Sequence, residues 1–295
     1  MTHLRTLFSR ARHAPAAPVV LATAALAALA AEPTTPDPPW TAQRLALAEE
    51  LWGEGFLNPG GAAEVVRLAT PLGLSGAMSL LLIRVGAGGP PRALTGEFGV
   101  WVSSYDSDAG LVALAADRLQ RAGAAVAKRA TAEPWNPAAP HFLKRGFHQI
   151  VAFDALRDAD AHTVLTAFLQ ATKPGGQLAL QELVADAPLD ANDPAVAAWC
   201  RLERRTAEVP PEAAITETMR RLGYDVRVIE DQSSRHIGLA VQGWTATIRR
   251  LRDVHPSRAY GATLVDEAEL WTRRVGLMHA GRIRLVRWHA IARAR

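Results

Sequence analysis

The stretch AMSLLLIRVGAGGPP (residues 77–91) constrains the fold of this 295-residue chain more than any other segment. Its apolar first half is too short for a surface helix and predicts a buried strand, which leads into a glycine-rich turn. A second strand is expected at Val100–Asp106 (VWVSSYD), and it ends in an acid. A strand, a glycine turn and another strand with a terminal carboxylate form the outline of a nucleotide-binding fold.

Strand and helix patterns alternate through the rest of the chain. Further strands are expected at residues 124–130, 148–156 and 177–184, in a helix–strand step at 213–231, and at 282–292. Helices are expected between them, as at 108–123, which starts with an aspartate and stops at a glycine. This order predicts an α/β fold: a Rossmann-like, doubly wound, mostly parallel sheet with helices on both faces and an antiparallel last strand.

The first 39 residues form an apolar extension followed by a proline-rich linker. The apolar run from Val19 to Ala31 has 13 residues, too few to span a bilayer, which needs about 20. It suits a secretory signal, a short helix that touches a membrane or a partner, or an alanine-rich extension with no role. A folded domain is expected over 40–295, with a helical entry segment at 40–74 and two halves at 75–185 and 186–295.

Composition narrows the classes of function. Hydrophobic residues make up 49% of the chain, so a substantial core is available. The 33 basic residues include only three lysines, a bias typical of a GC-rich genome, and no basic run is interleaved with aromatic residues, so we expect no nucleic-acid partner. Cys200 is the only cysteine, which excludes an internal disulfide and a cysteine-based zinc site. We expect no bound metal.

The order of several motifs resembles the class I S-adenosylmethionine-dependent methyltransferases over most of residues 40–295. The resemblance is closest to small-molecule N-methyltransferases of the sarcosine/dimethylglycine and phosphoethanolamine type and to their bacterial relatives. The segments that carry it are ELWGEGFLNPGG (50–61), VGAGGPPRAL (85–94), WVSSYDSD (101–108), ATKPGGQLALQELV (171–184) and MRRLGYDVRVIED (219–231). The resemblance implies a cofactor-binding half at 75–185 and an acceptor or cap half at 186–295.

The resemblance also implies which residues bind S-adenosylmethionine. Gly86, Ala87 and Gly88 form the first glycine motif, where the two glycines have no Cβ and let the backbone approach the cofactor. Asp106 ends the second strand, and its carboxylate presents two acceptor oxygens to the two ribose hydroxyls. Ser107 follows in the same motif. The alternative for Asp106 is an ordinary aspartate at the entry to a helix.

Other candidates lie in the entry segment and in the loop after the third strand. Glu133 stands where a polar group often meets the adenine amine, and the alternative is a solvated loop acid. Trp135 is a candidate to cover the adenine ring, or else a packing residue. Trp52 and Phe56 are placed to close over the cofactor, with an ordinary core role equally open for Trp52.

Two features depart from the family pattern at the same contact. Arg84 stands where family members usually carry an acid that faces the cofactor's α-amino group, and like charges repel by about 1–4 kcal/mol at intermediate dielectric. Pro90 and Pro91 remove two backbone donors from a turn that is shorter than usual. We therefore expect weakened cofactor binding, which Arg84→Glu should restore. Alternatively, Arg84 turns into a salt bridge or meets an anionic group on another ligand.

Candidates for the catalytic side are fewer, because methyl transfer mainly requires positioning of the acceptor and exclusion of water. Asp154 follows the fourth strand, at the edge where ligands bind in open α/β sheets. Glu182 lies in the fifth strand, and His236 lies with Arg235 in the segment where related enzymes build the acceptor pocket. Each has a structural alternative, and His289 in the last strand is expected to be structural.

The sequence therefore predicts a methyltransferase-like protein that transfers a methyl group to a small-molecule amine or hydroxyl. The alternative is a methyltransferase fold that no longer turns over and serves as a binding or assembly subunit, docked through its N-terminal extension. Because S-adenosylmethionine is a cytoplasmic metabolite, we expect a cytoplasmic protein that contacts a membrane or a protein partner through residues 1–39; secretion is the competing interpretation. The methyl acceptor and the oligomeric state cannot be read from the sequence.

Overall fold

A computed structural model describes residues 39–157, 159–251 and 257–293. All of the described residues belong to one compact unit, Pro38–Arg295. The apolar run at residues 19–31 lies outside the described residues. None of the described helices is long and apolar enough to cross a membrane.

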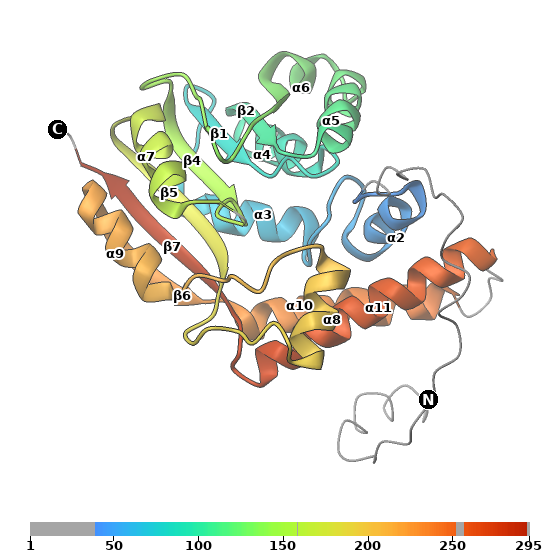
Figure 1. Ribbon diagram of the computed structural model, residues 1–295. Coiled ribbons are helices and arrows are strands. Elements are labelled where there is room, and N and C mark those ends of the chain that lie inside the picture. Colours follow the sequence, from blue (N-terminus) through green and yellow to red (C-terminus); the bar gives the residue numbers. More distant parts are fainter. Residues whose placement is uncertain (1–38, 158, 252–256, 294–295) are drawn as a thin grey trace, which may run out of the picture. The chain divides into compact units, whose positions relative to one another are not determined.

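A seven-stranded sheet forms the centre of this unit, with strand order β3-β2-β1-β4-β5-β7-β6 (Figure 1). Neighbouring strands from β3 to β5 pair in parallel, whereas β7 is antiparallel to both β5 and β6. The predicted Rossmann-like sheet with an antiparallel last strand is thereby confirmed. The strands are β1 (Ser79–Ile83), β2 (Trp101–Asp106), β3 (Ala130–Pro134), β4 (Phe147–Phe153), β5 (Thr172–Val184), β6 (Tyr224–Asp231) and β7 (Arg284–Ala292).

Helices cover both faces of the sheet (Figure 1). A short 3₁₀ helix, Thr70–Leu72, follows α3. The α-helices are α2 (Ala42–Trp52), α3 (Gly61–Ala69), α4 (Gly89–Phe98), α5 (Ala109–Arg121), α6 (Ala124–Arg129), α7 (Ala161–Ala171), α8 (Pro194–Glu203), α9 (Glu212–Leu222), α10 (Ser233–Arg250) and α11 (Arg258–His279).

Side chains of β1 alternate between two hydrophobic cores. Leu81 and Ile83 pack with residues of α7 and α9 on one face of the sheet. Leu80 and Leu82 pack with residues of α2, α3 and α4 on the other. All four side chains are fully buried, as expected for a central strand with helices on both faces. This two-sided burial holds the end of β1 in a defined place, where the glycine turn begins.

The expected strand at residues 124–130 is wrong in its position. Residues Ala124–Arg129 form helix α6, and the third strand, β3, begins only at Ala130. Alanine and lysine are good helix formers, and Gly123 separates this short helix from α5. The strand itself is defined by its parallel pairing with Val102–Asp106 of β2, a non-local interaction that local sequence does not reveal.

Two helices near the cleft start with side-chain caps, and the sequence predicts the aspartate start of α5. The Thr41 side chain accepts a hydrogen bond from the Arg44 amide at the start of α2, at 3.2 Å. Asp108 Oδ1 accepts one from the Leu111 amide at the start of α5, at 3.0 Å. Such caps satisfy amides at the first turn, which have no partner within the helix. They also direct the preceding loops toward the carboxyl edge of the sheet.

Candidate functional site

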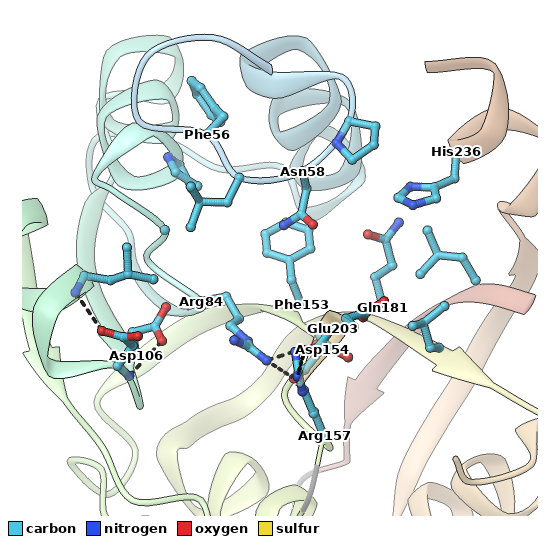
Figure 2. Close-up of a pocket in the computed structure, with 18 of the residues that line it drawn as sticks. Phe56, Asn58, Arg84, Asp106, Phe153, Asp154, Arg157, Gln181, Glu203 and His236 are labelled. Carbon is cyan, nitrogen blue, oxygen red and sulfur yellow. Dashed lines mark hydrogen bonds and ion pairs between the residues drawn. The ribbon is translucent and has the colours of Figure 1, made fainter. Parts of the chain in front are cut away.

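A cleft of ≈ 430 Å³ lies at the carboxyl edge of the parallel strands. Its volume falls in the range of sites for small molecules and cofactors, and its place matches the general rule for open α/β sheets. Figure 2 shows its two sides, with Asp106 on one side and His236 on the other. The loops after β1, β2 and β4 contribute Arg84, Gly86, Ser107 and Asp154 to the lining, and the entry segment contributes Phe56 and Asn58.

The glycine turn is held by the entry segment. Gly86 lines the cleft with a φ of 56°, a conformation that L side chains rarely adopt. The Ala87 and Gly89 amides donate to the Gly55 carbonyl at 3.1 and 3.0 Å. Ala87 and Gly88 lie away from the cleft, and a Cβ on Gly88 would lie 3.4 Å from Ala115 of α5. Of the three glycine-motif residues, the structure therefore places Gly86 against the cleft.

Pro90 and Pro91 lie in the first turn of α4. Amides in the first turn of a helix have no partner within the helix, so proline costs little there, and its fixed φ suits the helix. Both residues are buried, and Pro90 also lines the cleft. The two prolines therefore start α4 directly after the glycine turn.

Asp106 ends β2 and is 1% exposed. Its Oδ1 accepts a hydrogen bond from the Asp108 amide at 3.2 Å, whereas Oδ2 has no hydrogen-bond partner among the described residues. Burial raises the pKa of this carboxyl, and the positive charge of Arg84 opposes the shift. A buried acceptor without a donor is costly, so a ligand with adjacent hydroxyls would satisfy it. The geometry therefore fits the ribose of S-adenosylmethionine.

The remaining cofactor candidates divide into two groups. Ser107 and Phe56 line the cleft. Glu133 is an exposed residue on β3. Burial, and then the negative charge of Glu133, raise the pKa of Tyr105. Trp52 is core: its ring meets that of Trp271 edge to face, with 5.2 Å between centroids. Trp135 packs against Phe142 and Phe168 in the core on the other face of the sheet.

Arg84 and Asp154 meet at the floor of the cleft (Figure 2). Arg84 Nη2 donates to Asp154 Oδ2 at 2.9 Å and to the Asp154 carbonyl at 3.4 Å. Burial alone would raise the pKa of Asp154, but the guanidinium groups of Arg84, Arg205 and Arg157 outweigh burial and lower it. The salt bridge that the sequence left as an alternative for Arg84 is thus present. Asp154 is held as an ionised member of a charge cluster.

Glu182 accepts hydrogen bonds from the loop after β4. It is 2% exposed, and its Oε1 accepts hydrogen bonds from the amides of Ala155 and Leu156 at 2.6 and 3.1 Å. Burial, and then the nearby charge of Asp154, raise the pKa of Glu182 well above its ordinary value. The side chain lies beneath the cleft lining. Its contacts fix the position of Asp154.

His236 lies on α10, at the opposite wall of the cleft, and is 8% exposed. Its ring lies 5.6 Å from that of Trp271, and its Nε2 has no hydrogen-bond partner within the described ranges. Burial, reinforced by the positive charge of Arg274, holds its pKa well below 6.5. The imidazole is therefore neutral at pH 7, and its Nε2 is available for a hydrogen bond to a ligand.

Two of the neighbours named from the sequence are structural. Arg235 forms an ion pair with Glu64 of α3 at 2.8 Å. His289 Nε2 lies 2.6 Å from Gln177 Oε1 across the β5–β7 pair. The cleft also has lining residues that sequence reasoning missed: Trp40, Arg44, Asn58, Phe153, Gln181, Glu203, Glu267, Trp271 and Arg274. Phe153 and Gln181 lie in strands that the sequence predicted, and Asn58 lies in the predicted entry segment, but no local signal placed their side chains in the cleft. The described residues hold no group of three or more potential metal ligands.

No protein-family model matches the sequence. A curated relative, phosphoethanolamine N-methyltransferase 2 of Caenorhabditis elegans, is 26% identical over 141 residues, which is 47% of this chain and 32% of the relative. The chain thus matches about a third of that relative's length.

Solved structures cover more of the chain. Phosphoethanolamine N-methyltransferase 2 of Haemonchus contortus, in complex with S-adenosyl-L-methionine, matches 85% of this chain and 57% of its own, with a TM-score of 0.74 and 18% identity. Geranyl diphosphate C-methyltransferase of Streptomyces coelicolor, with geranyl diphosphate and S-adenosyl-L-homocysteine, matches 78% of this chain and 79% of its own, with a TM-score of 0.60 and 14% identity. The chain has the Rossmann-like fold of the class I S-adenosylmethionine-dependent methyltransferases.

Proposed function

We propose that this protein is an S-adenosylmethionine-dependent methyltransferase that acts on a small-molecule amine or hydroxyl. The observation that carries the proposal is Asp106, a buried carboxylate at the end of β2 with one oxygen that accepts no hydrogen bond from the described residues. It borders the cleft beside Gly86, where the backbone is free of a Cβ. Fold alone does not establish an activity, so the proposal depends on this site.

Asp106 and Gly86 would hold the nucleoside part of the cofactor. Asp106 offers Oδ2 to a ribose hydroxyl, while the Asp108 amide keeps Oδ1 in position. Ser107 borders the same end of the cleft. S-adenosylmethionine, when bound, supplies a methyl group on a positively charged sulfur. The task of the chain is then to align the acceptor with that methyl group and to exclude water.

His236 would contact the methyl acceptor. Its neutral imidazole lies across the cleft from Asp106, close to Trp271 and Arg274, and can hydrogen-bond an amine or hydroxyl of the acceptor. Asp154 is paired with Arg84, and Glu182 is bonded to two amides, so neither carboxyl has a base role in this arrangement. We propose that His236 positions the acceptor through a hydrogen bond, with Phe153 and Trp271 as apolar wall.

Calorimetric titration with S-adenosylmethionine and S-adenosylhomocysteine tests the proposal. We expect saturable binding at micromolar ligand, and ATP under the same conditions is a control for nonspecific nucleotide binding. A panel of small amines and hydroxyl compounds, followed by release of S-adenosylhomocysteine, then tests turnover. Absence of binding at millimolar cofactor would contradict the proposal and favour a methyltransferase fold that serves as a binding or assembly subunit.

A further inference from the structure

The residues that directly follow β1 and β4 have unusual backbone conformations. Arg84 follows β1 with a φ of 74°, and Asp154 follows β4 with a φ of 46°. Both are left-handed conformations, which L side chains seldom adopt, and such residues persist where the surrounding structure demands them and cluster at functional sites. Since β1 and β4 are adjacent parallel strands, the two residues extend into the same cleft.

Both members of the Arg84–Asp154 pair have polar atoms that make no hydrogen bond with a described residue. In the described part of the chain, every side-chain hydrogen bond of Arg84 uses Nη2, which leaves Nε and Nη1 as donors for a ligand. Asp154 uses Oδ2 for Arg84, whereas its Oδ1 accepts no hydrogen bond from a described residue and lies 3.9 Å from Arg205 Nη1 in a longer ion pair. The pair therefore presents a cation and an anion side by side, each able to bond a further group.

The place of the pair relative to Asp106 identifies its complement. Asp106, Arg84 and Asp154 stand at the carboxyl ends of β2, β1 and β4, which are consecutive strands in the sheet. Strand spacing puts the outer two about 10 Å apart. A ligand whose ribose meets Asp106 therefore extends along this edge toward Arg84 and Asp154 (Figure 2).

We propose that the Arg84–Asp154 pair binds the zwitterionic amino-acid end of the cofactor, with the α-carboxylate on Arg84 and the α-ammonium on Asp154. This assignment rests on the proposed function. It gives the acid at the end of β4 the role that the family gives to an acid at position 84. The guanidinium then attracts the α-carboxylate, so Arg84 strengthens cofactor binding, opposite to the repulsion that the sequence alone suggests.

A purely structural pair would behave differently. In that case the ion pair would only connect the loops after β1 and β4, and its loss would weaken every ligand of the cleft alike. A role in binding the amino-acid group predicts a selective effect. The discriminating probe is 5′-methylthioadenosine, which keeps the adenine, ribose and thioether of S-adenosylhomocysteine but has no amino-acid group.

The experiment compares the dissociation constants of these two ligands in the full chain and in Arg84→Gln and Asp154→Asn. Each variant should weaken S-adenosylhomocysteine by about 10- to 100-fold, as expected for loss of a charge-assisted hydrogen bond, and leave 5′-methylthioadenosine within about threefold. Arg273→Gln is the matched control, because Arg273 pairs with Glu269 on an exposed face of α11, and it should change neither ligand.

The outcomes separate the two proposals. If the unaltered chain binds neither ligand, the proposed function fails before the pair is tested. If the unaltered chain binds both, equal weakening of both ligands in the variants, or no change in S-adenosylhomocysteine affinity, overturns the assignment of the pair. Tighter S-adenosylhomocysteine binding by Arg84→Glu would overturn it as well, and would restore the repulsion account. Retained 5′-methylthioadenosine affinity also shows that a variant still folds.

Discussion

The two edges of the parallel sheet both carry polar clusters, but the clusters differ in how fully they are bonded. At the amino edge, Ser79 Oγ donates to the Gly146 carbonyl at 2.8 Å, and the Ser79 amide donates to His148 Nδ1 at 3.0 Å. Lys173 Nζ lies 3.0 Å from His148 Nε2. At the carboxyl edge, Asp106 and Asp154 each keep a buried oxygen without a hydrogen-bond partner among the described residues.

This difference indicates where a ligand belongs. A buried polar group without a partner costs about 1–3 kcal/mol, so a ligand that bonds such a group stabilises the folded protein. At the amino edge, the polar groups of Ser79, His148 and Lys173 contact one another and stabilise the starts of β1, β4 and β5. The carboxyl-edge cluster is incomplete without a ligand, and His236 across the cleft shows the same feature at Nε2. Variants at the two edges should therefore separate stability from binding.

Asp106→Asn should produce the largest change. The amide keeps the shape of the side chain but loses the negative charge and one acceptor, so S-adenosylhomocysteine affinity should fall by about 10- to 100-fold by calorimetry. Because the lost group is a buried carboxylate whose pKa is raised by burial, the melting temperature should not fall. A variant that melts earlier but binds normally would show that Asp106 is a structural residue.

Glu182→Ala should act on stability first. It removes the acceptor of the Ala155 and Leu156 amides, both buried, and should lower the free energy of unfolding by about 2 kcal/mol in urea. Glu182→Gln is the control, because it keeps an oxygen at that position and matches the protonated carboxyl that the raised pKa favours. Equal losses in the two variants would mean that charge, not the pair of hydrogen bonds, is what matters there.

His148→Ala tests the amino edge. The hydrogen bond that its Nδ1 accepts from the Ser79 amide should contribute about 1 kcal/mol to the free energy of unfolding. Affinity for S-adenosylhomocysteine should be unchanged, because the residue lies at the opposite edge of the sheet from Asp106. A clear loss of affinity would break the distinction between the two edges.

His236→Gln should leave stability at pH 7 nearly unchanged and should alter its pH dependence. The folded-state pKa of His236 lies well below 6.5, so between that value and 6.5 the unfolded chain binds more protons than the folded one. The unfolding free energy therefore falls as pH drops below 6.5, by at most about 1.4 kcal/mol per pH unit from this group. Urea titrations from pH 7 to 5 should show a shallower decline in the variant, and an identical slope would contradict burial of a neutral imidazole.

Much of the fold was predictable because its signals are local. The apolar run of β1, the glycine turn and the acid of β2 lie within 30 residues of one another. When such strands pair in parallel, their carboxyl ends lie at the same edge of the sheet, where ligands bind. The error at residues 124–130 has the opposite cause. Their local helix propensity is genuine, and the neighbouring strand β3 exists because β2 offers it a partner.

By itself, the sequence determined the Rossmann-like order of elements and the positions of Gly86 and Asp106 at the ligand edge, because both follow directly from strand ends. Only the tertiary structure decided which charged group Arg84 faces. Its partner, Asp154, is 70 residues away in the chain, and the two meet because β1 and β4 are neighbours and both backbones turn left-handed there. The charge of a residue is known from the sequence, but the charge that it faces depends on which loops the sheet brings together.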